Sequence, residues 1–187
     1  MLNSIKLQVA IAIIWVFLYS LNRALNVFLY DHSYIFIIFI PAGFKIAIAC
    51  LFEKNIFWGL FFGALITALI FLEDAMLLYF NNNVLIYALI TAGSPIFTIW
   101  LINKLLPLGK NLEYLNVQKV LIISVVYSII NSFMHNTYVL LSQDITFEKY
   151  QTDSMLMFVG DILGSLLFLV FVAYYRKEIF KIIKKYS

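Results

Sequence analysis

Long apolar runs separated by short polar segments form the dominant pattern along this chain. Runs of about 20 apolar residues are long enough to cross the hydrocarbon core of a bilayer as α-helices. The sequence predicts six such runs, at residues 7–28, 33–52, 55–71, 83–106, 119–141 and 155–175. The predicted fold is therefore all-α, a polytopic membrane protein with six transmembrane helices.

The connections between these runs leave little chain for a soluble domain. Only Glu53 and Lys54 separate the second run from the third, so these two helices are predicted to be antiparallel neighbours. The longest connection, residues 142–154, is too short to fold independently. We expect a single integral membrane domain over residues 1–187, with a basic cytoplasmic tail at residues 176–187 and no output domain in the same chain.

The composition excludes several classes of protein. With 64% hydrophobic and 12% charged residues, the chain does not have the composition of a soluble globule. Cys50 is the only cysteine, so an intrachain disulfide is excluded and a thiolate metal site is not expected. No glycine-rich phosphate loop, zinc-binding HExxH pattern or paired carboxylate motif is present. The sequence predicts no metal, no cofactor, no enzymatic activity and no nucleic-acid partner.

The basic residues are distributed unevenly between the two predicted faces of the membrane. Lys149 lies in an outer connection. The N-terminus, the second and fourth connections and the C-terminal tail hold Lys6, Lys54, Lys104, Lys110, Lys119, Arg176, Lys177, Lys181, Lys184 and Lys185. Because cytoplasmic segments are enriched in Lys and Arg, this asymmetry predicts that both termini are cytoplasmic. The basic tail also suits contact with an anionic membrane surface.

Ionisable residues within the spans are few, and each is costly at membrane depth unless it faces protein or water. They are Arg23, Lys45, His135 and Asp161. From the predicted helix ends, Asp161 and His135 lie about 9 Å below the outer surface and Lys45 about 18 Å below it. The long stem of Lys45 points back toward the outer end of its helix, so its ammonium group approaches the level of Asp161.

We therefore predict a polar cluster of Arg23, Lys45, Asn131, His135 and Asp161 in the outer third of the membrane, in which Asp161 pairs with Lys45 or Arg23. Three interpretations remain open from the residues alone. The cluster fixes helix register only, or it lines a ligand-binding vestibule open to the exterior, or His135 and Asp161 have a proton-linked role.

Glycines and prolines mark predicted helix contacts and kinks. Small residues four apart share one helical face and let another backbone approach closely. The third and sixth helices each carry such a pair, and prolines fall inside the second and fourth runs, where they kink a helix. The residues concerned are Gly59, Gly63, Gly160, Gly164, Pro41 and Pro95.

Three segments together resemble one known family. PAGFKIAIACLFEKNIFWGLFFGAL at residues 41–65, AGSPIFTIWLINKLL at 92–106 and VGDILGSLL at 159–167 are similar, in order and spacing, to the membrane-associated sensor domain of the first type, a MASE-type integral membrane sensor. The likeness covers roughly residues 40–170. The family positions matched here are Pro41, Gly43, Gly160, Asp161 and Gly164.

The resemblance implies a sensory module in a bacterial inner membrane. Domains of this family are usually joined to histidine kinases or cyclic-dinucleotide enzymes. This chain resembles a short, stand-alone version with fewer spans, so we expect a non-enzymatic sensor-like or partner-binding module that acts through a separately encoded protein. The expected partners are the lipid bilayer, a membrane or cytoplasmic signalling protein and a small-molecule ligand.

A second interpretation is the small-molecule-binding membrane subunit of an energy-coupling-factor transporter. Those subunits also have six helices and cytoplasmic termini, and they dock through small residues in the first helix. Ala10 and Ala12 lie in that helix but do not have the expected spacing of four.

Overall fold

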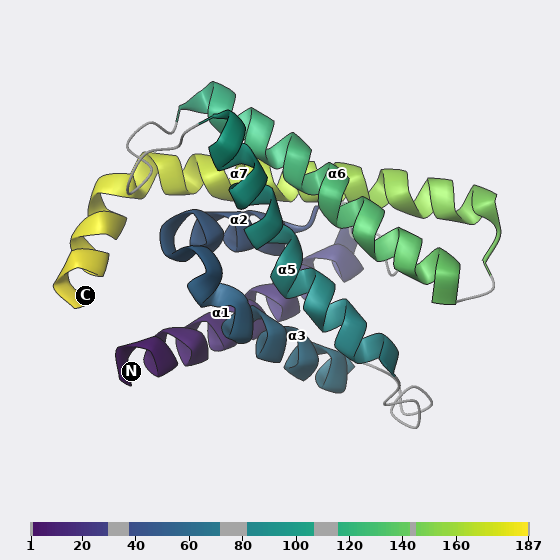
Figure 1. Cartoon of the computed structure of the whole chain (residues 1–187), viewed down its shortest axis with the longest axis horizontal. Coiled ribbons are helices and arrows are strands. Elements are labelled where there is room, and N and C mark those ends of the chain that lie inside the picture. Colours follow the sequence, from purple (N-terminus) through teal and green to yellow (C-terminus); the bar gives the residue numbers. More distant parts are fainter. Residues whose placement is uncertain (1, 30–37, 72–81, 107–115, 143–144, 187) are drawn as a thin grey trace.

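The computed structural model describes residues 2–29, 38–71, 82–106, 116–142 and 145–186, which are helical almost throughout (Figure 1). The predicted all-α class is therefore confirmed. The elements are α1 (Leu2–Leu29), α2 (Ile40–Phe52), the 3₁₀ turn η1 (Glu53–Ile56), α3 (Phe57–Phe71), α5 (Asn82–Leu105), α6 (Val117–Ser142) and α7 (Phe147–Tyr186). Residues 33–37, the start of the second predicted span, lie outside the described part.

Five helical stretches in the described residues are long and apolar enough to cross a membrane. They are Ser4–Leu25, Ile40–Phe71, Val84–Leu105, Val117–Ser142 and Phe147–Val172. This count differs from the six spans expected from sequence, because α2, η1 and α3 form one uninterrupted helical stretch. Within it α2 has 13 residues and α3 has 15, which at the α-helical rise gives each a length of only about 20 Å.

The chain turns between α2 and α3. Glu53 has a φ of 51°, a left-handed conformation that is uncommon for a residue other than glycine. Its backbone N–H still donates to the carbonyl of Ala49, which closes the end of α2. Figure 1 shows α2 and α3 leaving this turn in different directions. The two residues between the predicted spans therefore do separate two helices.

Contacts along the helices show which way each one runs. Gln8 of α1 bonds to Asn55 and Gly59, and Trp15 bonds to Thr67, so α1 and α3 are parallel. Asn22 bonds to Ile40 at the start of α2, near the other end of α1, so α2 runs opposite to both. Asn131 bonds to Ser94 of α5 while His135 stacks on Tyr87, so α5 and α6 are antiparallel. Asn131 bonds to Asp161 of α7 while Asn136 contacts Met157, so α6 and α7 are also antiparallel. Helix α7 runs parallel to α2, because Phe39 bonds to Gly160 and Gly43 faces Phe168. Successive long helices thus alternate in direction from α1 to α7.

The last helix begins earlier than the sequence pattern predicted. Residues 142–154 were expected to form a connection, but α7 starts at Phe147. The Thr146 hydroxyl accepts a hydrogen bond from the backbone N–H of Lys149 at 3.2 Å, which is a helix N-cap. The Lys149 ammonium also lies 3.6 Å from Asp153, one turn further on. The cap and this ion pair make a polar first turn helical, although apolar content alone marks it as a loop.

The contact between α2 and α7 places the buried polar residues of both helices near each other. A Cβ added at Gly164 would overlap the backbone carbonyl group of Phe39, and one added at Gly43 would overlap the Phe168 side chain. The Phe39 backbone N–H donates to the Gly160 carbonyl at 3.0 Å. Backbone therefore packs directly on backbone here, which only glycine permits.

Gly59 and Gly63 have a similar setting between α3 and α1. A Cβ on Gly59 would lie 2.8 Å from the Gln8 carbonyl oxygen, and one on Gly63 would lie 2.8 Å from Trp15. The prolines differ from each other. Pro41 lies in the first turn of α2, where its missing N–H has no helical partner in any case, whereas Pro95 lies inside α5.

Candidate functional site

A network of buried polar side chains joins four helices in the interior. The Asn131 amide of α6 is its centre. Its Nδ2 donates to Oδ2 of Asp161 on α7 at 2.7 Å, and its Oδ1 accepts from Ser94 on α5 at 2.7 Å. The same Oδ1 lies 3.4 Å from the Lys45 ammonium on α2. We call Lys45, Ser94, Asn131 and Asp161 the buried network.

The charged members of the buried network are removed from both lipid and water. Lys45 and Asp161 are each 1% exposed, and Asn131 is 0% exposed. A charge in such a position is strongly destabilising unless polar or aromatic groups compensate it. The short hydrogen bond from Asn131 partly compensates the Asp161 carboxylate, since hydrogen bonds to ionised acceptors are about twice as strong as neutral ones.

Aromatic rings compensate the Lys45 ammonium. The nitrogen lies 5.5 Å from the centre of the Trp15 ring, 5.6 Å from that of Phe39 and 5.2 Å from that of Tyr127. Cations are attracted to the faces of such rings, by about 2 kcal/mol when desolvated. Because Trp15 belongs to α1 and Tyr127 to α6, this aromatic cage extends the network to a fifth helix.

One carboxylate oxygen in the network has no partner. Oδ1 of Asp161 is buried and accepts no hydrogen bond from the described residues. An unsatisfied buried oxygen raises the free energy of the folded state, by about 1–3 kcal/mol. The site therefore retains an acceptor that a donor from a ligand, a water molecule or a moved side chain would satisfy.

The structure brings together three of the five residues predicted to cluster, but Asp161 does not pair directly with Lys45 or Arg23. Lys45, Asn131 and Asp161 meet as expected. Among the described residues, however, no ion pair joins Asp161 to Lys45 or to Arg23, because the Asn131 amide lies between the two charges and bonds to both. The sequence indicated the depth of each charge, and depth alone does not distinguish direct contact from an amide bridge.

Arg23 lies apart from the buried network. Its guanidinium donates to the Phe71 carbonyl at 3.4 Å and lies 4.8 Å from the centre of the Phe71 ring. It therefore caps the last turn of α3, where its positive charge faces the negative end of the helix dipole. Its place near the end of the first predicted helix did not identify this neighbour.

His135 faces α5 and packs on aromatic rings. Its imidazole stacks on Tyr87 with ring centres 5.7 Å apart, and Tyr87 also contacts Tyr138 edge-on. No hydrogen bond in the described residues connects His135 to Asp161. The next residue of α6, Asn136, donates to the Ser132 carbonyl at 2.9 Å and lies 3.5 Å from the Met157 sulfur.

The aromatic cage around Lys45 was not predicted from the sequence. Trp15 and Tyr127 are both buried, but aromatic residues make up 18% of the chain, so neither stands out from its neighbours. The available signal was indirect. A lysine so deep in an apolar segment requires compensation, and rings are the commonest groups in this chain that supply it without a second charge.

The side chains of the buried network are suited to binding a ligand through hydrogen bonds and opposite charge. Within the described residues, no group of three His, Cys, Asp or Glu side chains is placed to hold a metal ion. Cys50 is only partly buried and is a free thiol. The network offers a cation, an amide that both donates and accepts, a hydroxyl and a carboxylate, all of which exchange hydrogen bonds.

One of the comparisons with known proteins identifies a family. No curated protein and no solved structure matches the chain. The MASE1 family model matches residues 9–184, which is nearly the whole chain. The resemblance noted from the three sequence segments is thereby confirmed, and with it a multi-pass membrane protein with a sensor domain, a class that is typically non-catalytic. The chain belongs to the MASE1 family of membrane sensor domains.

Proposed function

We propose that this chain is a sensory input module in which the buried network sets the position of α7, and that α7 transmits this position to an output protein. The observation that carries the proposal is the continuity of α7, a single helix of 40 residues from Phe147 to Tyr186. Asp161 is its fifteenth residue, and Figure 1 shows that α7 bends near its C-terminal end without a break. A change at Asp161 thus acts on the same helix that continues past the end of the membrane-spanning stretch at Val172.

We expect the buried network to have two arrangements, the Asn131 bridge of the structure and a second in which a ligand or ion engages Asn131 or Asp161 Oδ1. In the structure Asn131 separates the two charges, and Asp161 Oδ1 has no partner. A ligand or ion that engages Asn131 or satisfies Oδ1 changes how strongly α7 is held against α2 and α6. A ligand shifts such an equilibrium only by its difference in affinity for the two arrangements. Because Oδ1 is an acceptor, the favoured ligand class is a small hydrogen-bond donor or cation.

The proposed topology has six crossings with both termini in the cytoplasm. The support is the alternating direction of α1, α2, α3, α5, α6 and α7, together with the excess of Lys and Arg on one predicted face. In this topology Glu53 and Lys54 lie at the cytoplasmic surface, and the short helices α2 and α3 form a pair of crossings. The membrane is the bacterial cytoplasmic membrane, and residues 1–187 act as one domain.

The proposed partner is a separately encoded signalling protein. Family membership supports the class of this partner, since membrane sensor domains of this type are usually joined to kinases or cyclic-dinucleotide enzymes. The segment 176–187 contains Arg176 and four lysines, which suits contact with an acidic surface of a partner or with an anionic leaflet. Motion of α7 reaches that segment without an intervening loop.

The test compares signalling output between two matched carboxylate variants on the same helix. Asp161→Asn removes the buried charge, whereas Asp153→Asn removes a charge that lies beside the exposed Lys149. In cells that produce the protein at equal levels, we expect Asp161→Asn to change histidine-kinase phosphorylation or cyclic-dinucleotide concentration several-fold. Asp153→Asn should leave both unchanged. Unaltered output in Asp161→Asn cells and in cells lacking the gene would refute the proposal.

A further inference from the structure

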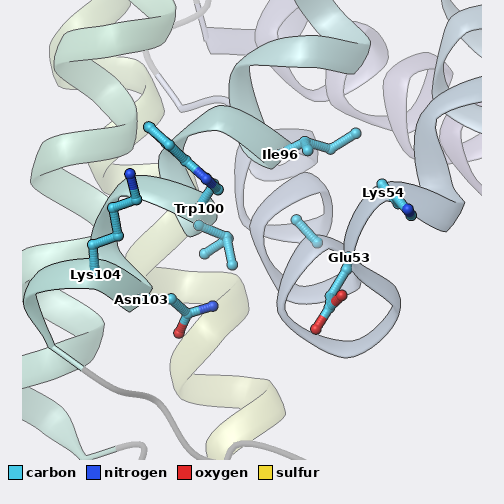
Figure 2. A pocket seen from close by; sticks show the side chains of 8 residues that line it. Glu53, Lys54, Ile96, Trp100, Asn103 and Lys104 are labelled. Carbon is cyan, nitrogen blue, oxygen red and sulfur yellow. The ribbon is translucent and has the colours of Figure 1, made fainter.

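A second site lies between two and three helical turns from the buried network, where the turn after α2 meets the end of α5. A cavity of about 370 Å³ is lined there by Ala49, Glu53, Lys54, Ile96, Ile99, Trp100, Asn103 and Lys104. Figure 2 shows Trp100, Asn103 and Lys104 on one side and Glu53 and Lys54 on the other. The cavity therefore lies between two elements that are far apart in the sequence.

The lining divides into an apolar base and a charged rim. Ala49 and Ile99 are buried, Ile96 is half-buried, and all three supply hydrocarbon surface. Glu53, Lys54, Asn103 and Lys104 are exposed. Such a division fits an amphipathic ligand, whose apolar part contacts the base while its polar part meets the rim.

The cavity lies at the level of a membrane surface. Lys104 is next to the last residue of the apolar stretch Val84–Leu105, and Trp100 on the preceding turn is 51% exposed. Exposed tryptophans are typical of the membrane–water interface. The Lys104 ammonium lies 3.8 Å from the centre of the Trp100 ring, which holds the cation at this level. In the six-crossing topology, Glu53 and Lys54 reach the same surface.

The rim charges specify the headgroup. Lys54 and Lys104 are cationic and Glu53 is anionic, so the rim carries a net charge of +1. Within the described residues no ion pair joins Glu53 to either lysine, so these three charges do not neutralise one another. A phosphodiester with one negative charge complements the two lysines, and hydroxyl groups on the same headgroup would donate to Glu53 and to the Asn103 carbonyl.

We propose that this cavity binds an anionic phospholipid with a hydroxylated headgroup, of which phosphatidylglycerol is the representative. The phosphate lies between Lys54 and Lys104, and the glycerol backbone and the start of one acyl chain lie over Ile96 and Ile99. The site rests on the six-crossing topology proposed above but not on signalling by the buried network. It couples the turn between α2 and α3 to the lipid composition of the inner leaflet.

The experiment measures lipid binding to the purified full chain by native mass spectrometry. Phosphatidylglycerol and phosphatidylethanolamine with identical acyl chains are titrated separately, with soluble glycerol phosphate as a third ligand. We expect phosphatidylglycerol to bind most tightly. The double substitution Lys54→Gln and Lys104→Gln should weaken it by about 30-fold, since each lysine beside an anionic lipid contributes about fivefold. The matched control removes two charges elsewhere, with Lys6→Gln and Lys119→Gln, and should not change binding.

A second variant tests the apolar base independently of charge. Ile96→Trp fills the cavity from a half-buried position and should lower phosphatidylglycerol binding, while the thermal unfolding temperature stays that of the wild type. Equal binding in the wild type, the double lysine variant and Ile96→Trp overturns the site. Equal binding of phosphatidylethanolamine overturns the headgroup assignment, and tight binding of glycerol phosphate alone shows an anion site rather than a lipid site.

Discussion

At the residue scale, the position of Asn131 between two buried charges explains how the protein retains both of them. Its amide donates to Asp161 and accepts from Lys45 and Ser94. An amide bridge lets each charge keep a polar partner although the Lys45 and Asp161 side chains do not bond to each other. The sequence located Lys45, Asn131 and Asp161, because charged and amide groups are rare inside apolar runs. It did not reveal Trp15 and Tyr127, because aromatic groups are frequent there.

A double-mutant cycle measures the coupling between the two buried charges. Lys45→Met and Asp161→Asn should each lower the free energy of unfolding by about 3–5 kcal/mol, because each leaves the other charge without an opposite charge nearby in a buried site. The double variant should lose less than the sum of the two, by at least about 2 kcal/mol. Unfolding is followed in detergent micelles.

The control cycle uses an ion pair on the same helix that is exposed. The Lys149 side chain is 61% exposed and lies 3.6 Å from Asp153. Coupling between Lys149→Met and Asp153→Asn should be about 0.3–0.5 kcal/mol, as for other exposed pairs four residues apart. Additive losses for Lys45 and Asp161, no larger than in this control, would show that the buried charges do not interact.

At the element scale, the buried network depends on the close approach of α2 and α7. The Gly160 and Gly164 spacing was readable from sequence, and so was the likelihood of a helix contact there, because residues four apart share a face. The surface that packs against these two glycines was not predicted from the sequence. Gly164 packs on the backbone of Phe39, just before α2, and this contact requires the three-dimensional arrangement. The N-cap at Thr146 was also not predicted, because the polar composition of residues 142–154 is typical of a loop.

Gly164→Ala should destabilise the protein, because the added methyl group overlaps the Phe39 carbonyl group. The expected loss is about 1–3 kcal/mol, the usual cost of overpacking. Gly93→Ala is the matched control, since a Cβ there has nothing within 4 Å and alanine favours the helix. In detergent, the thermal unfolding temperature should fall for Gly164→Ala and should not fall for Gly93→Ala. An unchanged unfolding temperature for Gly164→Ala would mean that α2 and α7 are not in backbone contact.

At the scale of the whole molecule, the number of crossings decides where the termini and the lipid cavity lie. Apolar run lengths predicted six, while length and composition of the described helices give five, since α2, η1 and α3 form one continuous helical stretch. An even number places both termini on one side, and an odd number places them on opposite sides. Run length does not settle this, because each of α2 and α3 is shorter than the roughly 30 Å hydrocarbon core.

Cysteine labelling in intact cells tests the topology. With Cys50→Ala as the background, we expect a membrane-impermeant maleimide to label Lys149→Cys from outside the cell. Lys6→Cys and Lys54→Cys should react only after the membrane is opened, because both lie on the cytoplasmic face in six crossings. If residues 40–71 crossed once, Lys54→Cys would lie at mid-membrane and resist labelling from either side.

If the buried network sets the position of α7 relative to α2, as we propose, removing the Asp161 charge changes the distance between these helices. The most direct measurement is the distance between spin labels at Lys54→Cys, after α2, and at Tyr174→Cys on the exposed face of α7, both in the Cys50→Ala background. We predict one narrow distribution for the otherwise unmodified chain and for Asp153→Asn, and a mean shifted by about 2 Å or a second population for Asp161→Asn. The same single, unshifted distribution in Asp161→Asn would contradict the claim.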